Sequence, residues 1–107
     1  MATLQTVRKL ALSLPRVEES TSYGQPAFKV TGKMFACLPP HQSAEPDSLV
    51  IRLDFDQRAA LLEESPEIYY ITDHYKNYPA VLIRLKRVKQ DALKDLLTAA
   101  HRFVQTR

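Results

Sequence analysis

The chain has 107 residues, of which 45% are hydrophobic and 25% charged, and its formal net charge is +3. This length suits one domain with one core, so we expect a single domain over residues 1–107, and the composition excludes disordered and fibrous classes. No apolar run approaches the roughly 20 residues that cross a bilayer, and the N-terminus lacks the unbroken apolar stretch of a signal peptide, so we expect a cytoplasmic protein.

The first third of the chain predicts a helix followed by a hairpin. Apolar residues recur at helical spacing in residues 3–14, and a proline follows them. Residues 16–25 are polar and show no periodicity, so we expect a connection there. Residues 27–30 and 34–38 are typical of strands, and Gly32 between them can take the positive φ of a tight hairpin turn.

The rest of the chain predicts a loop and then alternating strands and helices. Three prolines in residues 39–47 indicate a loop. The elements expected after it are a strand at 48–53, a helix at 54–65 that ends before Pro66, strands at 67–72 and 80–88, and a helix at 90–104. In the last strand Val81, Ile83 and Leu85 should face the core, which leaves Arg84 and Lys86 on the other side.

The order αβββαββα predicts an α+β fold. The connections are too short for parallel crossovers, so the sheet should be mainly antiparallel. We therefore expect a five-stranded sheet packed with three helices, which must cover at least one of its faces.

Two turns share a pattern, because "SYGQPAF" and "HYKNYPAV" each combine tyrosine, a turn residue and Pro-Ala. Gly24 can adopt a conformation closed to other residues, and Pro26 restricts the residue before it to extended geometry. In the second copy Asn77 is the natural left-handed residue and Pro79 repeats the restriction. We interpret both as structural corners, with Tyr23 free to pack across the first.

The sequence shows no pattern for a metal or a cofactor. His41, His74 and His101 lie in separate segments, and Cys37 lies within an apolar strand. A chain with two glycines cannot form a glycine-rich phosphate loop. We predict no metal site and no cofactor, and we interpret Cys37 as a buried structural thiol in a reducing compartment.

Catalytic groups are sparse as well. Glu18, Glu19 and His74 could in principle supply a general acid or base. We interpret the two glutamates as a solvated loop pair and His74 as a hydrogen-bonded turn residue, and predict that the protein is not an enzyme.

The corner and hairpin "SYGQPAFKVTGKMFA", with "HYKNYPAVLIRL" before the last helix, resemble the MmcQ/YjbR family of small bacterial proteins. The resemblance covers nearly the whole chain. It implies an α+β fold related to the double-wing type, in which β-hairpins project like wings, and a role in DNA binding. Asn77 stands where we expect glycine in many relatives, and the turn should survive this difference.

Charge is unevenly placed, and this bears on the DNA-binding role. Residues 39–73 hold eight acids and two bases, whereas residues 76–94 hold six bases and one acid. A binding surface for duplex DNA needs grouped bases that neutralise phosphates. The candidates on the two predicted hairpins are Lys29, Lys33, Lys76, Arg84, Lys86 and Arg87.

The alternative is a module that binds a protein or a small ligand without catalysis. Four of the five tyrosines lie between residues 69 and 78, and amphipathic rings are common on recognition surfaces. The candidate cleft consists of Tyr23, His74, Tyr75 and Tyr78. Bases in one stripe would favour DNA, whereas scattered bases beside a pocket at Tyr78 would favour a ligand.

Overall fold

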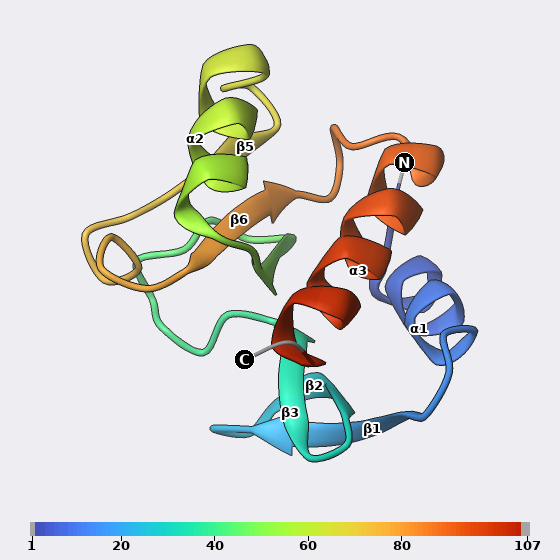
Figure 1. Cartoon of the computed structure of the whole chain (residues 1–107). Coiled ribbons are helices and arrows are strands. Elements are labelled where there is room, and N and C mark those ends of the chain that lie inside the picture. The colour runs from blue at the N-terminus through green and yellow to red at the C-terminus, as the bar shows by residue number, and fades with distance from the viewer. Residues whose placement is uncertain (1, 106–107) are drawn as a thin grey trace.

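The computed structural model describes residues 2–105, which form three helices and a six-stranded sheet (Figure 1). The elements in chain order are α1 (Leu4–Leu12), β1 (Val17–Ser22), β2 (Gln25–Val30), β3 (Lys33–Cys37), β4 (Ser48–Arg52), α2 (Phe55–Glu64), β5 (Tyr69–Tyr70), β6 (Ala80–Arg84) and α3 (Gln90–Gln105). The predicted α+β class with three helices is confirmed.

The sheet is antiparallel throughout, in the order β1-β2-β3-β4-β6-β5. It has six strands rather than the five expected, because β1 forms from the segment that we interpreted as a connection. This strand is an edge strand, and its burial pattern shows no fully buried residue. A strand without a fully buried residue needs no apolar alternation, so the periodicity that identifies other strands is missing here.

Two-residue turns close the first two hairpins. Tyr23 and Gly24 join β1 to β2 with φ of 52° and 80°, and Thr31 and Gly32 join β2 to β3 with φ of 48° and 81°. Positive φ at both positions is the type I′ geometry that matches the twist of paired strands. The predicted positive φ of Gly24 is confirmed. Tyr23 does not pack across the turn as we expected, because its side chain is 91% exposed.

The main core lies between one face of the sheet and the helices α1 and α3. In Figure 1 α3 crosses the sheet and lies beside α1, and its closest partners are β3, β4 and α1. Strand alternation supplies the sheet side of this core. As predicted, Val81, Ile83 and Leu85 of the β6 segment are buried in it.

The opposite face of the sheet has a second, smaller cluster. Its buried members are Ala27, Cys37, Val50, Tyr75, Ala80 and Leu82. Because α1 and α3 lie on the other face, this cluster is covered by the loops that precede β4 and β6, residues 38–47 and 71–79. An open face of a sheet covered only by loops can leave room for a ligand.

Candidate ligand-binding groove

A groove of about 610 Å³ lies on the face of the sheet opposite to α1 and α3. Its lining comes from the β1–β2 turn, from strands β3, β4 and β6, and from both covering loops. The residues are Ser22, Tyr23, Met34, Cys37, Pro40, His41, Val50, Arg52, His74, Tyr75, Tyr78, Pro79 and Ala80. The structure thus brings together all four residues of the predicted cleft, Tyr23, His74, Tyr75 and Tyr78.

Small apolar side chains form the floor of the groove, with a thiol among them. Cys37 is buried, and this burial raises the pKa of its thiol to about 11, although the nearby Arg52 charge acts in the opposite direction. The thiol is therefore protonated at neutral pH, which agrees with the structural role predicted for Cys37.

Tyr75 carries the buried polar atom of the groove that is left unpaired. The residue is 8% exposed, and its hydroxyl makes no hydrogen bond of ordinary geometry with any described residue. Burial raises the pKa of this phenol, and the nearby Cys37 adds to the shift, whereas the backbone amide of His41 lies near enough to oppose it. A buried hydroxyl without a good partner is costly, so an added acceptor or water here would be stabilising.

Exposed aromatic rings form the rim. Tyr23 is 91% exposed and Tyr78 is 56% exposed, which is unusual for large side chains that flank one groove. His74 stacks on His41 with ring centroids 3.8 Å apart and an angle of 8° between the planes. His74 lies in a turn, as expected, and the contact that its ring makes there is this stacking between the two covering loops.

His41 is itself oriented by its own loop. The backbone N–H of Ser43 donates to His41 Nδ1 at 3.1 Å, and the Ser43 hydroxyl lies 2.7 Å from the same nitrogen. The hydroxyl of Ser43 also lies 2.9 Å from that of Thr72 in the second covering loop. These contacts join the two loops above the sheet and hold the His41 ring where it stacks on His74.

Arg58 of α2 holds the loop that carries Tyr75 and Tyr78. Its guanidinium donates to the carbonyl oxygens of Tyr78 at 2.8 Å and Lys76 at 3.1 Å, and over longer distances to those of Ala80 and Tyr75. One side chain thus binds four backbone carbonyls of one wall of the groove.

The predicted left-handed conformation of Asn77 in this loop is wrong. Among the described residues other than glycine, positive φ occurs at Arg16, Tyr23, Thr31 and Asp47. The chain between Thr72 and Ala80 instead turns through successive short-range hydrogen bonds, such as Tyr75 N–H to Thr72 and Tyr78 N–H to Tyr75. The Arg58 guanidinium binds the carbonyls of this segment, so no left-handed residue is needed to close it.

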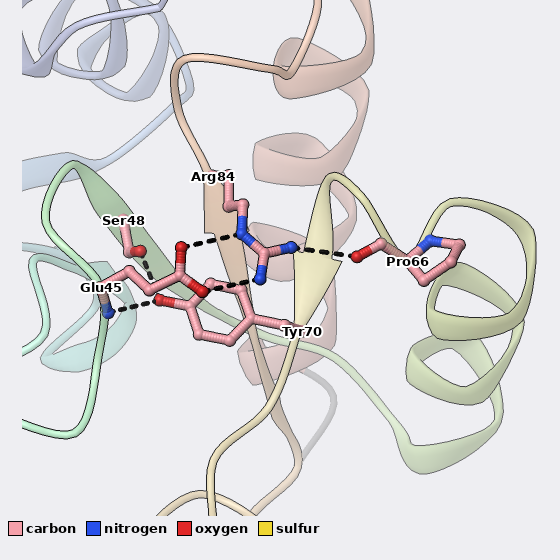
Figure 2. Close-up of polar contacts among 5 residues, drawn as sticks. All are labelled: Glu45, Ser48, Pro66, Tyr70 and Arg84. Carbon is pink, nitrogen blue, oxygen red and sulfur yellow. Dashed lines mark hydrogen bonds and ion pairs between the residues drawn. The ribbon is translucent and has the colours of Figure 1, made fainter.

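Arg84 holds the other covering loop, as Figure 2 shows. Its guanidinium makes a bidentate ion pair with Glu45, at 3.0 and 2.7 Å, and donates to the carbonyl of Pro66 at 3.0 Å. It also lies 4.4 Å from the centre of the Tyr70 ring, whose hydroxyl accepts a hydrogen bond from the Glu45 backbone N–H and contacts Ser48. Arg84 lies on the side of β6 away from the core, as predicted, but most of its donors are already used within the protein.

The six candidate DNA-binding bases do not form one stripe. Lys29 and Lys33 lie beside the β2–β3 turn, and Lys76 lies in the loop before β6. Arg84 pairs with Ser48 at the start of β4, which is the other end of the sheet. Lys86 and Arg87 follow it there, and Lys86 forms an ion pair with Asp47 at 3.2 Å.

Arg52 is a groove residue that the predicted cleft omitted. It is exposed and lies opposite Ala80 on the groove side of β4, and its guanidinium makes no hydrogen bond or ion pair with another described residue. Alternation along a strand at residues 48–53 puts Arg52 on the face away from the core, together with Val50, so the sequence held this part of the signal. The missing information was that two distant loops converge on this face.

No acid–base cluster forms from Glu18, Glu19 and His74. The two glutamates lie in β1 rather than in a loop, and their side chains alternate between the faces of the sheet. Glu19 faces α1, where hydrogen bonds from Arg8 lower the pKa of its carboxyl.

Over residues 2–105 no group of three or more His, Cys, Asp or Glu could hold a metal ion, and no helix is long and apolar enough to cross a membrane.

Comparison with known proteins finds a matching family, sequence relatives and a similar solved structure. It matches the sequence model of the YjbR family over residues 12–103. Uncharacterized proteins of Mycobacterium bovis and Mycobacterium tuberculosis are each 27% identical to it over 114 residues, covering 94% of this chain and 86% of each relative. A crystal structure of a Deinococcus radiodurans protein with a DUF419 domain has a TM-score of 0.83 and 21% identity, covering 100% of this chain and 81% of that one. At that identity the structural likeness shows a common fold alone.

Proposed function

The chain belongs to the YjbR family, and we propose that it is a non-catalytic binding protein whose small ligand occupies the groove on the helix-free face of the sheet. The observation that carries this proposal is the convergence of three separate segments on one concave site. The β1–β2 turn brings Tyr23, one covering loop brings His41, and the other brings His74, Tyr75 and Tyr78. The volume of about 610 Å³ falls within the range of small-molecule sites.

Two further observations support the proposal. Arg58 and Arg84 use most of their donors to hold the covering loops, so the walls are built before a ligand arrives. Preorganised walls reduce the conformational entropy that binding costs. Tyr23 also adopts a left-handed conformation at a turn position that favours asparagine, although its ring gains little contact from the fold. Residues held in rare backbone conformations without a packing gain cluster at functional sites.

The proposal is tested by screening a fragment library against ¹⁵N-labelled protein by NMR. We expect bound fragments to shift the amide signals of Cys37, Val50 and Ala80. The variant Tyr78→Ser should lower the affinity for these fragments. Leu12→Gln, which removes an exposed apolar side chain from α1, is the matched control and should leave fragment binding unchanged. If the fragments shift amides elsewhere and leave the groove unaffected, the proposed function is wrong.

Weak, largely non-specific binding of duplex DNA is the second candidate function. It follows from the family resemblance and from the exposed Lys33, Lys76 and Arg87, with Lys29 half-buried near Lys33. The groove proposal has more support, because Arg84 and Lys86 are engaged in ion pairs and the bases lie at two ends of the sheet. If four bases meet phosphates, log K should fall with log salt with a slope of about −3 to −4.

The test for DNA binding is a titration of a labelled random duplex at two salt concentrations. Reversing Lys29 and Lys76 to glutamate should weaken binding to every sequence alike, because phosphate contacts carry no sequence information. Reversing Lys89 and Lys94 makes the same change of net charge and serves as the control. Reversal of Arg84 is unsuitable, since it would also release the loop at Glu45. No binding even at about 50 mM salt would rule this function out.

The cytoplasmic location expected from the sequence is also part of the proposal. Cell fractionation with an antibody against the protein tests it, and recovery in the membrane or extracellular fraction would contradict it.

A further inference from the structure

We infer that the ligand of the groove is a small, flat aromatic carboxylate, whose ring lies between the rim tyrosines and whose carboxylate pairs with Arg52. This inference rests on the proposed function and adds the chemical class of the ligand. Three features of the groove carry it: its single charge, its aromatic rim and its apolar floor.

The charge of the groove has one sign. Arg52 is the one Lys, Arg, Asp or Glu residue among the lining residues. Residues 39–73 supply four of the thirteen lining residues, although this segment holds eight acids and two bases. Its second base, Arg58, is used for the loop carbonyls. The acids of this segment therefore lie outside the groove. A guanidinium that has no hydrogen-bond or ion-pair partner within residues 2–105, in a groove whose described lining holds no carboxylate, favours an anion.

The number of charges favours a carboxylate over a phosphate ester. A planar guanidinium binds either group with two parallel hydrogen bonds. A phosphate monoester carries about −1.5 to −2 charges at neutral pH, whereas a carboxylate carries one. Arg52 is the one arginine or lysine of the described groove lining, and the apolar floor of Met34, Val50 and Ala80 offers no second cation to a doubly charged group.

The rim selects a flat aromatic body. Tyr23 and Tyr78 expose large rings on the same groove, and His74 presents a third ring at the edge. Aromatic pairs contribute about 0.5–1.5 kcal/mol beyond the area that they bury. Met34 on the floor adds a thioether, which makes favourable contacts with ring edges. An extended aliphatic chain would not use these rings.

The test compares 2-naphthoate with two analogues that carry the same ring system. 2-Naphthamide is neutral and 2-naphthylmethylammonium is cationic. Each compound is titrated into ¹⁵N-labelled protein, and the dissociation constant is taken from the amide shifts of Cys37, Val50 and Ala80. We expect 2-naphthoate to bind about tenfold more tightly than the amide, which is the size of effect typical of one charge-assisted hydrogen bond. The ammonium compound should bind more weakly than both.

The variant Arg52→Gln isolates the charge. It should remove the difference between 2-naphthoate and 2-naphthamide while leaving the affinity for the amide unchanged. Arg87→Gln, at an exposed arginine outside the groove, is the matched control and should preserve the tenfold difference.

The outcomes separate this inference from the proposed function. Equal affinity of acid and amide at the groove would overturn the carboxylate inference and leave the groove as a binding site. Tighter binding of hexanoate than of 2-naphthoate would overturn the aromatic part. Failure of the whole fragment library to shift groove amides would overturn the proposed function and this inference with it.

Discussion

Replacement of Arg58 by methionine should loosen one wall of the groove without unfolding the protein. Methionine keeps the apolar stem of the side chain and removes the guanidinium, which donates to four carbonyls of residues 75–80. The helix α2 itself should persist, because Asp54 still caps its first turn through the Gln57 N–H.

The size of the effect follows from the geometry of the lost contacts. The two shorter hydrogen bonds, to Tyr78 at 2.8 Å and to Lys76 at 3.1 Å, should dominate, at about 1 kcal/mol each in this partly exposed position. The guanidinium also lies 4.7 Å from the centre of the Phe55 ring, a contact that adds about 0.5 kcal/mol. We therefore expect a local loss of about 2–2.5 kcal/mol.

Hydrogen exchange of the loop amides measures this loss directly. The N–H groups of Tyr78 and Ala80 are hydrogen-bonded within the loop, and a loss of about 2 kcal/mol corresponds to a roughly 30-fold fall in their protection. Arg102→Met, at an exposed position of α3, is the control and should leave them unchanged. Unchanged protection of Tyr78 and Ala80 in Arg58→Met would refute the role assigned to this arginine.

Three other variants or treatments test separate parts of the structure. Gly24→Ala should lower the free energy of unfolding by about 1 kcal/mol or more in denaturant melts, because φ of Gly24 is 80°, although the added Cβ meets no atom within 4 Å. Gly24→Asn should lose less stability. Equal stability of the wild-type protein and both variants would contradict the left-handed conformation of this turn. Tyr23→Asn should raise the free energy of unfolding by about 1 kcal/mol while weakening fragment binding, and a destabilised variant would show that the Tyr23 ring supports the fold. Cys37 should react slowly with Ellman's reagent at pH 8, since a pKa of about 11 leaves roughly one thiolate in a thousand, and fast stoichiometric labelling of the folded protein would contradict its burial.

The last variant concerns stability in acid. Hydrogen bonds from Arg84 lower the pKa of Glu45 from its ordinary value of 4.5, so the ion pair stabilises the fold above that value and is lost as the pH falls through the lowered one. Glu45→Gln should therefore flatten the fall in urea midpoint between about pH 5 and pH 2. A variant with the same acid dependence as the wild-type protein would show that the pair adds nothing. Glu19→Gln, which breaks the pair with Arg8 instead, separates loop effects from those of the helix face.

Local patterns predicted the helices and most strands because these elements bury an apolar stripe or alternate along the chain. The same alternation placed Arg84 correctly on the face away from the main core. It failed for β1, whose sequence "VEESTS" gains strand geometry from pairing with β2 and from the Tyr23–Gly24 turn. Edge strands of this kind are specified by a neighbour rather than by their own composition.

The candidate cleft was partly predictable because tyrosines cluster in sequence near His74. Its completion by His41, Cys37 and Arg52 was not, since these residues reach the groove only when two loops fold over the same face of the sheet. The role of Arg84 was missed for a related reason. Its partner Glu45 is 39 residues away, and no local pattern shows that a base in a strand pairs with an acid in a proline-rich loop.

The most direct measurement is a set of crystals soaked with pooled small aromatic fragments, followed by refinement of the bound compounds. The groove proposal predicts density between Tyr23 and Tyr78 above the floor of Val50 and Ala80, with acidic fragments placed toward Arg52. Fragments bound at other sites of the same crystals, with the groove accessible to solvent and occupied only by water, would contradict it.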